Sequence, residues 1–295
     1  MTHIEIVSPC CLHLGFVQFE GEPCRLTIAL QHPFLQFTVS ASDDFFASGP
    51  CADTAIKFAE RYLSNEKLPH KGLIEIEEAV PAFMGIGSDA MLDVNLTIAF
   101  AELNHQKPYS EMLEASKGGL SLFDSEGHCA KRALVKHADE EAAWVFILVL
   151  PKPADEIEDD HEWSESHNLW RAGQNTNHDS ETYSRQLFLA VEQNDFKSFA
   201  STLANIHSLN EEALAQTGTP RTPSPGAKEI LQLMRDNGAL MCAQTLTGLG
   251  LYGLIQGSNA SRKLRAALSE HLGYFGPLVM ATICDNEGAR IRVIG

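Results

Sequence analysis

The sequence predicts an α+β protein built in two halves. Strand patterns and helix patterns occur in both halves of the 295-residue chain, and a stretch rich in Asp and Glu lies between them. A chain of this length is long for one hydrophobic core and suits two domains. We therefore expect a first domain over residues 1–150, an acidic linker or surface loop over residues 151–178, and a second domain over residues 179–295.

The first half is predicted to alternate strands and helices. Alternating or continuous apolar residues indicate strands, whereas apolar residues three and four apart indicate helices. In chain order we expect two strands within residues 3–40, a helix over 50–65, a strand over 72–78, a glycine turn over 81–88, helices over 89–104 and 109–116, turns and strands over 117–136, and a strand over 142–150. The last strand, AAWVFILVL, is apolar throughout, as expected when both faces are covered.

The second half is predicted to be richer in helices. The same criteria give helices over 181–193 and 196–214, a break over 220–225, a helix over 227–236, two strands around a glycine turn within 239–256, a helix over 258–272, and strands over 278–284 and 289–294.

Charge and composition exclude several classes of partner. The net charge of -17 repels nucleic acid and anionic membranes, so we expect neither as a partner. No apolar run reaches the roughly 20 residues that span a bilayer, and the first residues do not read as a signal peptide. The seven cysteines form no CxxC pair, which fits a reducing cytoplasm better than a disulfide framework.

A glycine turn carries the sharpest functional signal. Pro81 sets a bend after a strand, and Gly85, Ile86, Gly87 and Ser88 lead directly into a helix. Glycine lets the backbone approach a bulky anion, and the first amides of a helix have no internal acceptor. Together with the helix dipole they can bind phosphate, and the serine could cap the helix or donate its hydroxyl. The alternative is a plain strand–turn–helix connection, which glycines also favour. The turn is neither a Walker A loop nor a Rossmann motif, because the spacing of its residues differs from both.

Two segments resemble motifs of the GHMP small-molecule kinase superfamily. PAFMGIGSDA is similar to its second motif, and residues 237–257, NGALMCAQTLTGLGLYGLIQG, resemble its third. The resemblance implies a first domain like the second domain of a ribosomal protein and a ferredoxin-like second domain. It also implies that a second glycine turn, with Gln244, Thr247, Gly248 and Gly250, lies beside the phosphate loop.

In detail the chain resembles the β-ribofuranosylaminobenzene 5′-phosphate synthases of that superfamily. Four stretches carry the likeness: SPCCLHLGFVQFEG, MGIGSDAMLDV, AQTLTGLGLYGLI and DNEGARIRV. They match the family at His13, Gly15, Gln244, Gly248, Tyr252, Asn286, Gly288 and Ala289. This resemblance implies a transferase of tetrahydromethanopterin biosynthesis. It would couple phosphoribosyl pyrophosphate to a benzoate-type acid, with loss of carbon dioxide and pyrophosphate.

The chain departs from the synthases at positions that bear on phosphate binding. Cys11 stands where the family has arginine, and Asp89, Ala90 and Met91 replace Gly-Thr-Gln in the loop. An aspartate beside a phosphate repels it unless a metal ion intervenes or the carboxylate turns away. The loss of basic groups weakens binding of a highly charged pyrophosphate.

Two residues are candidates for a catalytic role. His13 could donate to a phosphate or a carboxylate, and the alternative is a histidine at the edge of the core with a backbone partner. Asp124 could act as a base or metal ligand near the site, and the alternative is an aspartate that caps a turn after a strand.

Charged residues near the turn are further candidates. Asp89 and Asp93 share a helix face and could hold Mg²⁺ against phosphates, although an acidic first turn also suits the helix dipole. Lys117, Lys131 and Arg132 could supply positive charge, although solvated surface is the default for such residues.

Three functions stay open on these residues. The first is the synthase activity, with Mg²⁺ stabilising the departing pyrophosphate. The second is an ATP-dependent kinase of a small metabolite, in which the same loop holds the triphosphate; ATP is expected only here. The third is a GHMP-fold protein without chemistry that serves as a binding partner. In each case we expect a small phosphorylated metabolite as ligand, and a homodimer is possible.

Overall fold

The computed structural model describes residues 2–136, 139–151, 179–216, 222–274 and 276–295. Nearly all of the predicted acidic linker, residues 152–178, lies outside the described residues. Within them, the predicted helices agree with the observed ones to within two residues at either end. The mixed α+β class is therefore confirmed.

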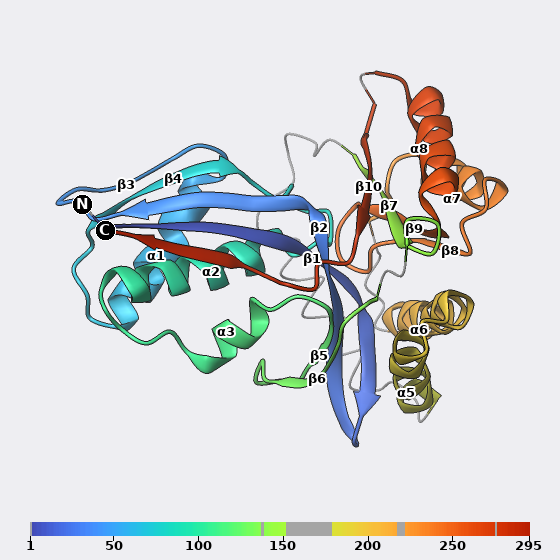
Figure 1. The fold of residues 1–295 in the computed structure, drawn as a ribbon, viewed down its shortest axis with the longest axis horizontal. Coiled ribbons are helices and arrows are strands. Elements are labelled where there is room, and N and C mark those ends of the chain that lie inside the picture. The colour runs from blue at the N-terminus through green and yellow to red at the C-terminus, as the bar shows by residue number, and fades with distance from the viewer. Residues whose placement is uncertain (1, 137–138, 152–178, 217–221, 275) are drawn as a thin grey trace.

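The first sheet has seven strands among the described residues, and a long hairpin forms its centre (Figure 1). The hairpin strands β1 (His3–Phe19) and β2 (Glu22–Ser40) are paired antiparallel from one end to the other. The sheet order is β11-β1-β2-β4-β3, and β5 pairs with the far half of β2 and with β6. The remaining strands are β3 (Phe45–Ser48), β4 (Gly72–Glu78), β5 (Leu120–Phe123), β6 (Cys129–Ala133) and β11 (Arg290–Ile294).

Three helices accompany the first sheet: α1 (Ala52–Asn65), α2 (Ser88–Leu103) and α3 (Ser110–Ala115). Helix α2 packs on β1 and β2 with one side and on α1 with the other. It is therefore apolar around most of its circumference, which is what a helix needs when it is buried on several faces. Burial of α2 fixes the position of the glycine turn that precedes it.

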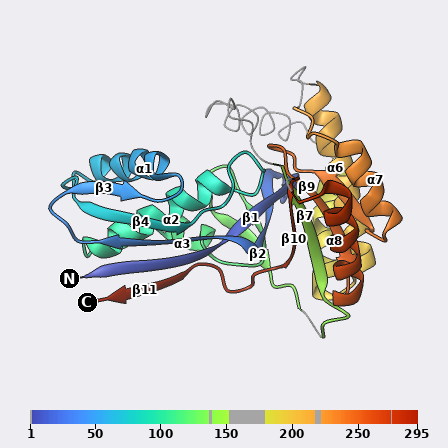
Figure 2. The same ribbon diagram turned by 90° about the horizontal axis from the view of Figure 1, so that it is seen from above.

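The second sheet has four strands in the order β10-β7-β9-β8. Helices α7 and α8 contact this sheet (Figure 2). Helices α5 and α6 pack on each other and on β1, and α6 also contacts β8. The elements are β7 (Trp144–Leu150), α5 (Asp179–Glu192), α6 (Phe196–Gln216), α7 (Ala227–Asp236), β8 (Met241–Gln244), β9 (Leu251–Gln256), α8 (Ser258–Leu272) and β10 (Leu278–Ile283).

The two sheets exchange strands across the predicted domain boundary. Strand β7 precedes residue 151 in the chain, yet it pairs with β9 and β10 of the second sheet. The last strand, β11, returns to the first sheet and pairs with β1. The division at residue 150 stays a prediction, but it does not coincide with the division between the sheets.

One strand, β3, was not predicted from the sequence. It has four residues, lies at the edge of the sheet and pairs parallel to β4. Four residues at an edge bury too few side chains to show a periodic pattern. No helix among the described residues is both long and apolar enough to cross a bilayer.

A buried amide anchors α6 to the hairpin where β1 is irregular. The register of β1 shifts between His13 and Gly15. There Asn210 accepts a hydrogen bond from Phe16 N at 2.8 Å and donates to Phe16 O at 2.9 Å. A Cβ on Gly15 would lie 3.1 Å from the Asn210 side chain, so glycine leaves room for this contact.

We predict that Asn210→Ala lowers the free energy of unfolding by about 2–4 kcal/mol, because it removes two buried hydrogen bonds between the side chain and the backbone of Phe16. Asn237→Ala is the matched control, since the Asn237 side chain also bonds a carbonyl, Leu233 O at 2.9 Å, but on the exposed end of α7. Urea denaturation measures both. Equal losses for the two variants would contradict the anchoring role.

Candidate phosphate-binding site

The loop before α2 is held to β1 through its carbonyl groups. Gly85 O accepts a hydrogen bond from His13 N at 3.4 Å, and Ile86 O accepts one from Cys11 N at 2.9 Å. Gly85 and Gly87 have φ angles of 68° and 74°, in the left-handed region that glycine adopts readily. Because the carbonyls face β1, the amides of the loop are not needed to hold it there.

The amide groups at the start of α2 are the candidate phosphate donors. Among the described residues, no hydrogen bond engages the N–H of Gly87 or Ser88. Ser88 is buried, and its hydroxyl oxygen has no partner. The helix begins at Ser88 after Gly87, without a side-chain cap, so the expectation that Ser88 caps the helix is wrong. Its hydroxyl therefore stays available to a ligand.

The four predicted phosphate-binding residues differ in exposure and in contacts. Gly85, Ile86 and Ser88 are buried, Gly87 is partly exposed, and Asp89, the residue after Ser88, is exposed. Gly85 and Ile86 shape the loop, because their carbonyls bond to β1 and Gly85 touches the second glycine turn. Gly87 and Ser88 stand where the loop opens, and they are the pair that we retain as phosphate donors.

The second glycine turn lies directly against this loop. A Cβ on Gly85 would lie 1.8 Å from Thr247 O, and one on Gly248 would lie 2.1 Å from Phe83 O. A Cβ on Gly250 would lie 2.3 Å from Met84 O. These approaches leave no space for a side chain, so three glycines are required by the contact itself. The two turns that the sequence singled out are neighbours in space.

Gln244 holds the second turn in place. Its Nε2 donates to Gly248 O at 2.9 Å and to Thr222 O at 2.8 Å, and its Oε1 accepts from Ser224 N at 3.0 Å. With these bonds the buried amide joins the turn to the segment before α7. Its geometry is that of a positioning residue.

His13 lies on β1 next to the loop. Its ring packs edge-on against Phe16, with 4.8 Å between ring centroids, and its Nε2 is buried without a partner. Burial, and then the charge of Arg25, lower the pKa of His13 to about 3, although a hydrogen bond with the Gly15 backbone opposes the shift. The imidazole is therefore neutral near pH 7. It can form a hydrogen bond with a ligand but supplies no positive charge.

Asp124 closes the turn between β5 and β6. Its Oδ1 accepts from the backbone N–H of Glu126 and of His128, each at 2.9 Å. Desolvation raises the pKa of Asp124, but these two bonds and the nearby His128 outweigh it and lower the pKa overall. Among the described residues no hydrogen bond or ion pair joins Asp124 to His13. The turn-capping alternative describes this geometry, and a catalytic role for Asp124 stays a prediction.

The two aspartates of α2 lie on the side of the helix that faces α1. Asp93 forms an ion pair with Arg61 at 2.5 Å. Desolvation, followed by the charge of Asp89, raises the pKa of Cys51 to about 11, which places Asp89 near the start of α1. The described residues contain no group of three or more His, Cys, Asp or Glu that could hold a metal ion. Asp89 as a single Mg²⁺ ligand stays a prediction.

The basic residues that the sequence offered for phosphate binding all have carboxylate partners. Lys117 and Arg132 both pair with Glu114, the latter at 3.0 Å, and Lys131 lies 4.0 Å from Glu192. The sequence analysis did not single out Arg25, for which the described residues provide no ion pair. Arg25 and His13 lie on different strands, so only the register of the hairpin shows that their side chains project from the same face.

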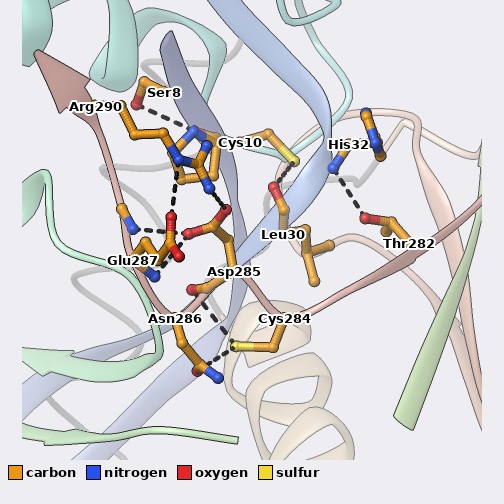
Figure 3. Close-up of polar contacts among 12 residues, drawn as sticks. Ser8, Cys10, Leu30, His32, Thr282, Cys284, Asp285, Asn286, Glu287 and Arg290 are labelled. Carbon is orange, nitrogen blue, oxygen red and sulfur yellow. Dashed lines mark hydrogen bonds and ion pairs between the residues drawn. The ribbon is translucent and has the colours of Figure 1, made fainter. Parts of the chain in front are cut away.

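The closing DNEGARIRV stretch has a structural role (Figure 3). Asp285 is buried, its Oδ1 accepts from Glu287 N and Gly288 N, and its Oδ2 accepts from Arg290 at 3.1 Å. Asn286 exchanges two hydrogen bonds with the backbone of Val135. The Asn286 bonds account for the asparagine, and a Cβ on Gly288 would lie 2.3 Å from Ser116 O, which accounts for the glycine. The stretch thereby holds the connection from β10 to β11 in place.

We predict that Gly85→Ala lowers the free energy of unfolding by about 1–3 kcal/mol more than Gly21→Ala, because only Gly85 touches the second turn. Both positions have a left-handed φ, 68° and 84°, so both variants share the backbone strain of about 1–2 kcal/mol. A Cβ on Gly21 meets nothing within 4 Å. Urea unfolding of the pair measures the difference. If both variants lose equal stability, the two turns are not in close contact.

No protein-family model and no curated protein sequence matches the chain. Solved structures do match over nearly their whole length. A homoserine kinase from Cytophaga hutchinsonii is 16% identical with a TM-score of 0.61, covering 98% of this chain and 97% of its own. The mevalonate diphosphate decarboxylase from Enterococcus faecalis is 13% identical with a TM-score of 0.65, covering 99% of both chains. The mevalonate-3-kinase from Thermoplasma acidophilum is 12% identical with a TM-score of 0.61, covering 98% of both. The two-sheet architecture is thus the GHMP kinase fold, as the glycine motifs indicated.

Proposed function

We propose that the chain is an enzyme that transfers a phosphoryl group from ATP to a small metabolite. The observation that carries this proposal is the free end of the glycine loop. There the amides of Gly87 and Ser88 and a buried, unpartnered hydroxyl lie together at the start of a long helix. Such a helix terminus favours a phosphate in an otherwise acidic protein.

The structural neighbours support a nucleotide as the source of that phosphate. The mevalonate-3-kinase is described with mevalonate 3-phosphate and ADP bound. The decarboxylase structure is described in terms of ATP binding mediated by mevalonate diphosphate. We infer by analogy that the glycine loop of this chain holds the phosphates of ATP.

Catalysis at such a site is mainly electrostatic and positional. The loop amides and the Ser88 hydroxyl would bind phosphate oxygens, where charge accumulates during phosphoryl transfer. Mg²⁺ bound to ATP neutralises the same charge and needs few protein ligands, because it keeps several waters. The exposed carboxylate of Asp89, one residue after Ser88, fits a role as one of those ligands.

The synthase activity is a second candidate, favoured by the convergence of the segments that resemble that family. Strand β1 bonds the glycine loop through Cys11 and His13, and the second turn packs on it through Gly248. Phosphoribosyl pyrophosphate would place its pyrophosphate where ATP places its terminal phosphates. The arginine that the synthases have at position 11 is absent here, which favours the kinase.

We predict that Mg·ATP raises the melting temperature of the protein and that Ser88→Ala weakens ATP binding by about 2- to 10-fold, the worth of one hydrogen bond. Because the Ser88 hydroxyl has no protein partner, the variant should keep its stability. Ser269→Ala, on the exposed side of α8, is the control and should bind ATP like the wild type. Calorimetric titration gives the three affinities.

A parallel titration with Mg·phosphoribosyl pyrophosphate separates the two enzymes. Tighter binding of that compound than of ATP, with carbon dioxide release from 4-hydroxybenzoate, would replace the kinase by the synthase. If neither compound binds, the protein is not an enzyme of either kind, and the reading as a binding partner becomes the leading one.

A further inference from the structure

One face of the hairpin carries polar side chains in a row next to the glycine loop. The strand register places His13 opposite Thr27, and Thr27 opposite Ser121 of β5. Residues opposite each other in a sheet point to the same face, as do residues two apart in one strand. Arg25 lies two residues from Thr27 along β2, so its side chain projects from the same face as that of His13.

Arg25 is a cation for which the described residues provide no counterion. It is exposed, and the described residues offer it no ion pair or hydrogen bond, although the chain carries a net charge of -17. Its guanidinium carbon lies 5.7 Å from the centroid of the Phe123 ring. Stacking on a ring holds the planar guanidinium in one orientation and leaves its N–H groups for an external oxyanion.

Three carboxylates at this end of the hairpin act on its other face. After the larger effect of desolvation, Asp124, Glu22 and Glu20 raise the pKa of Cys24. Cys24 is adjacent to Arg25 in the strand, so the two side chains point to opposite faces. On the face of Arg25, Arg132 lies opposite Ser121 and its charge is paired with Glu114 at 3.0 Å. Arg25 is thus the cation on this face that has no ion pair among the described residues.

The polar face leads from Arg25 toward the glycine loop. A Cβ on Gly87 would lie 3.3 Å from Cys11 Cβ, so the open end of the loop lies over Cys11. Cys11 pairs with Ala29, four residues along β2 from Arg25, which corresponds to about 14 Å of strand. His13 lies between these two points with its unpartnered Nε2. The separation of about 14 Å, with His13 between its ends, matches a small molecule that has an anionic group at one end and a polar group at the other.

We propose that this face is the acceptor subsite: Arg25 binds a carboxylate or phosphate group of a small hydroxylated acid, and His13 Nε2 forms a hydrogen bond with it closer to the glycine loop. Naming this ligand as the acceptor rests on the proposed function, whereas the binding of an oxyanion by Arg25 does not. The inference selects anionic acceptors over neutral ones of the same size.

The test compares anionic probes with neutral analogues of the same shape, in the absence of nucleotide. The pairs are 4-hydroxybenzoate with 4-hydroxybenzamide, and glycerol 3-phosphate with glycerol. Calorimetry or ligand-observed NMR gives affinities for the wild type, Arg25→Gln and Arg25→Lys. Arg185→Gln on α5 is the matched control, since Arg185 is exposed and its ion pair among the described residues is with Glu181 of its own helix.

We expect at least one anionic probe to bind the wild type better than its neutral analogue, and Arg25→Gln to weaken it at least 10-fold. Arg25→Lys should restore part of the affinity, and Arg185→Gln should leave it unchanged. The imidazole ¹⁵N resonances of His13, assigned with His13→Gln, should shift when that probe binds. The inference is overturned if anionic probes bind no better than neutral ones, or if Arg25→Gln leaves their affinity unchanged.

A separate ATP titration keeps this failure distinct from that of the proposed function. Arg25→Gln should bind Mg·ATP within twofold of the wild type, because Arg25 lies away from the loop amides. Acid binding through Arg25 without ATP binding would refute the kinase and leave the oxyanion site standing. ATP binding without acid binding would refute the acceptor subsite alone.

Discussion

Two backbone segments, the loop before α2 and the turn between β8 and β9, are in direct contact with no side chain between them. Leu249 N donates to Phe83 O at 2.7 Å, and the places where a Cβ would stand on Gly85, Gly248 and Gly250 are already taken by carbonyl oxygens. This contact joins the first sheet to the second. It also presses the buried half of the loop from one side while β1 holds its carbonyls from the other, so the free amides of Gly87 and Ser88 keep one orientation.

A rigid loop matters because the protein as a whole is unfavourable for anions. At a net charge of -17 the long-range field repels a phosphate, so binding depends on dipoles fixed at short range. Amides that are already aimed at the ligand need no reorganisation when it arrives. His13 is neutral, and Lys117, Lys131 and Arg132 are paired with carboxylates, so in the described part of the chain Arg25 is the unpaired positive charge on this face.

The sequence predicted most of the architecture because the signals for it are local. The strand over residues 72–78 and the helices over 227–236 and 258–272 follow from periodicity within one window, and they agree with the structure residue for residue. The glycine motifs indicated the fold because close backbone approach demands glycine at fixed places. Which sheet a strand joins is not local, and for this reason β7 and β11 fall on the other side of the predicted boundary.

The site was predictable only in part, for a related reason. Gly87 and Ser88 can be found from their place before a helix, but the roles of other residues depend on distant partners. Gln244 donates a hydrogen bond to the backbone before α7, and Asp124 accepts one from the backbone of its own turn. Arg25 becomes notable only when the register places it on the face of His13 and when the described residues are found to offer it no counterion. Neither property is visible in a single sequence.

The central claim is that a phosphate binds at the free amides of the glycine loop. Backbone ¹⁵N–¹H spectra of the labelled protein, recorded while Mg·ATP is added, test it most directly. We predict that the resonances of Gly87 and Ser88 move most and saturate together, while that of Gly21 at the hairpin tip stays in place. If ATP saturates the protein and leaves the Gly87 and Ser88 resonances unmoved, phosphate does not bind at the glycine loop.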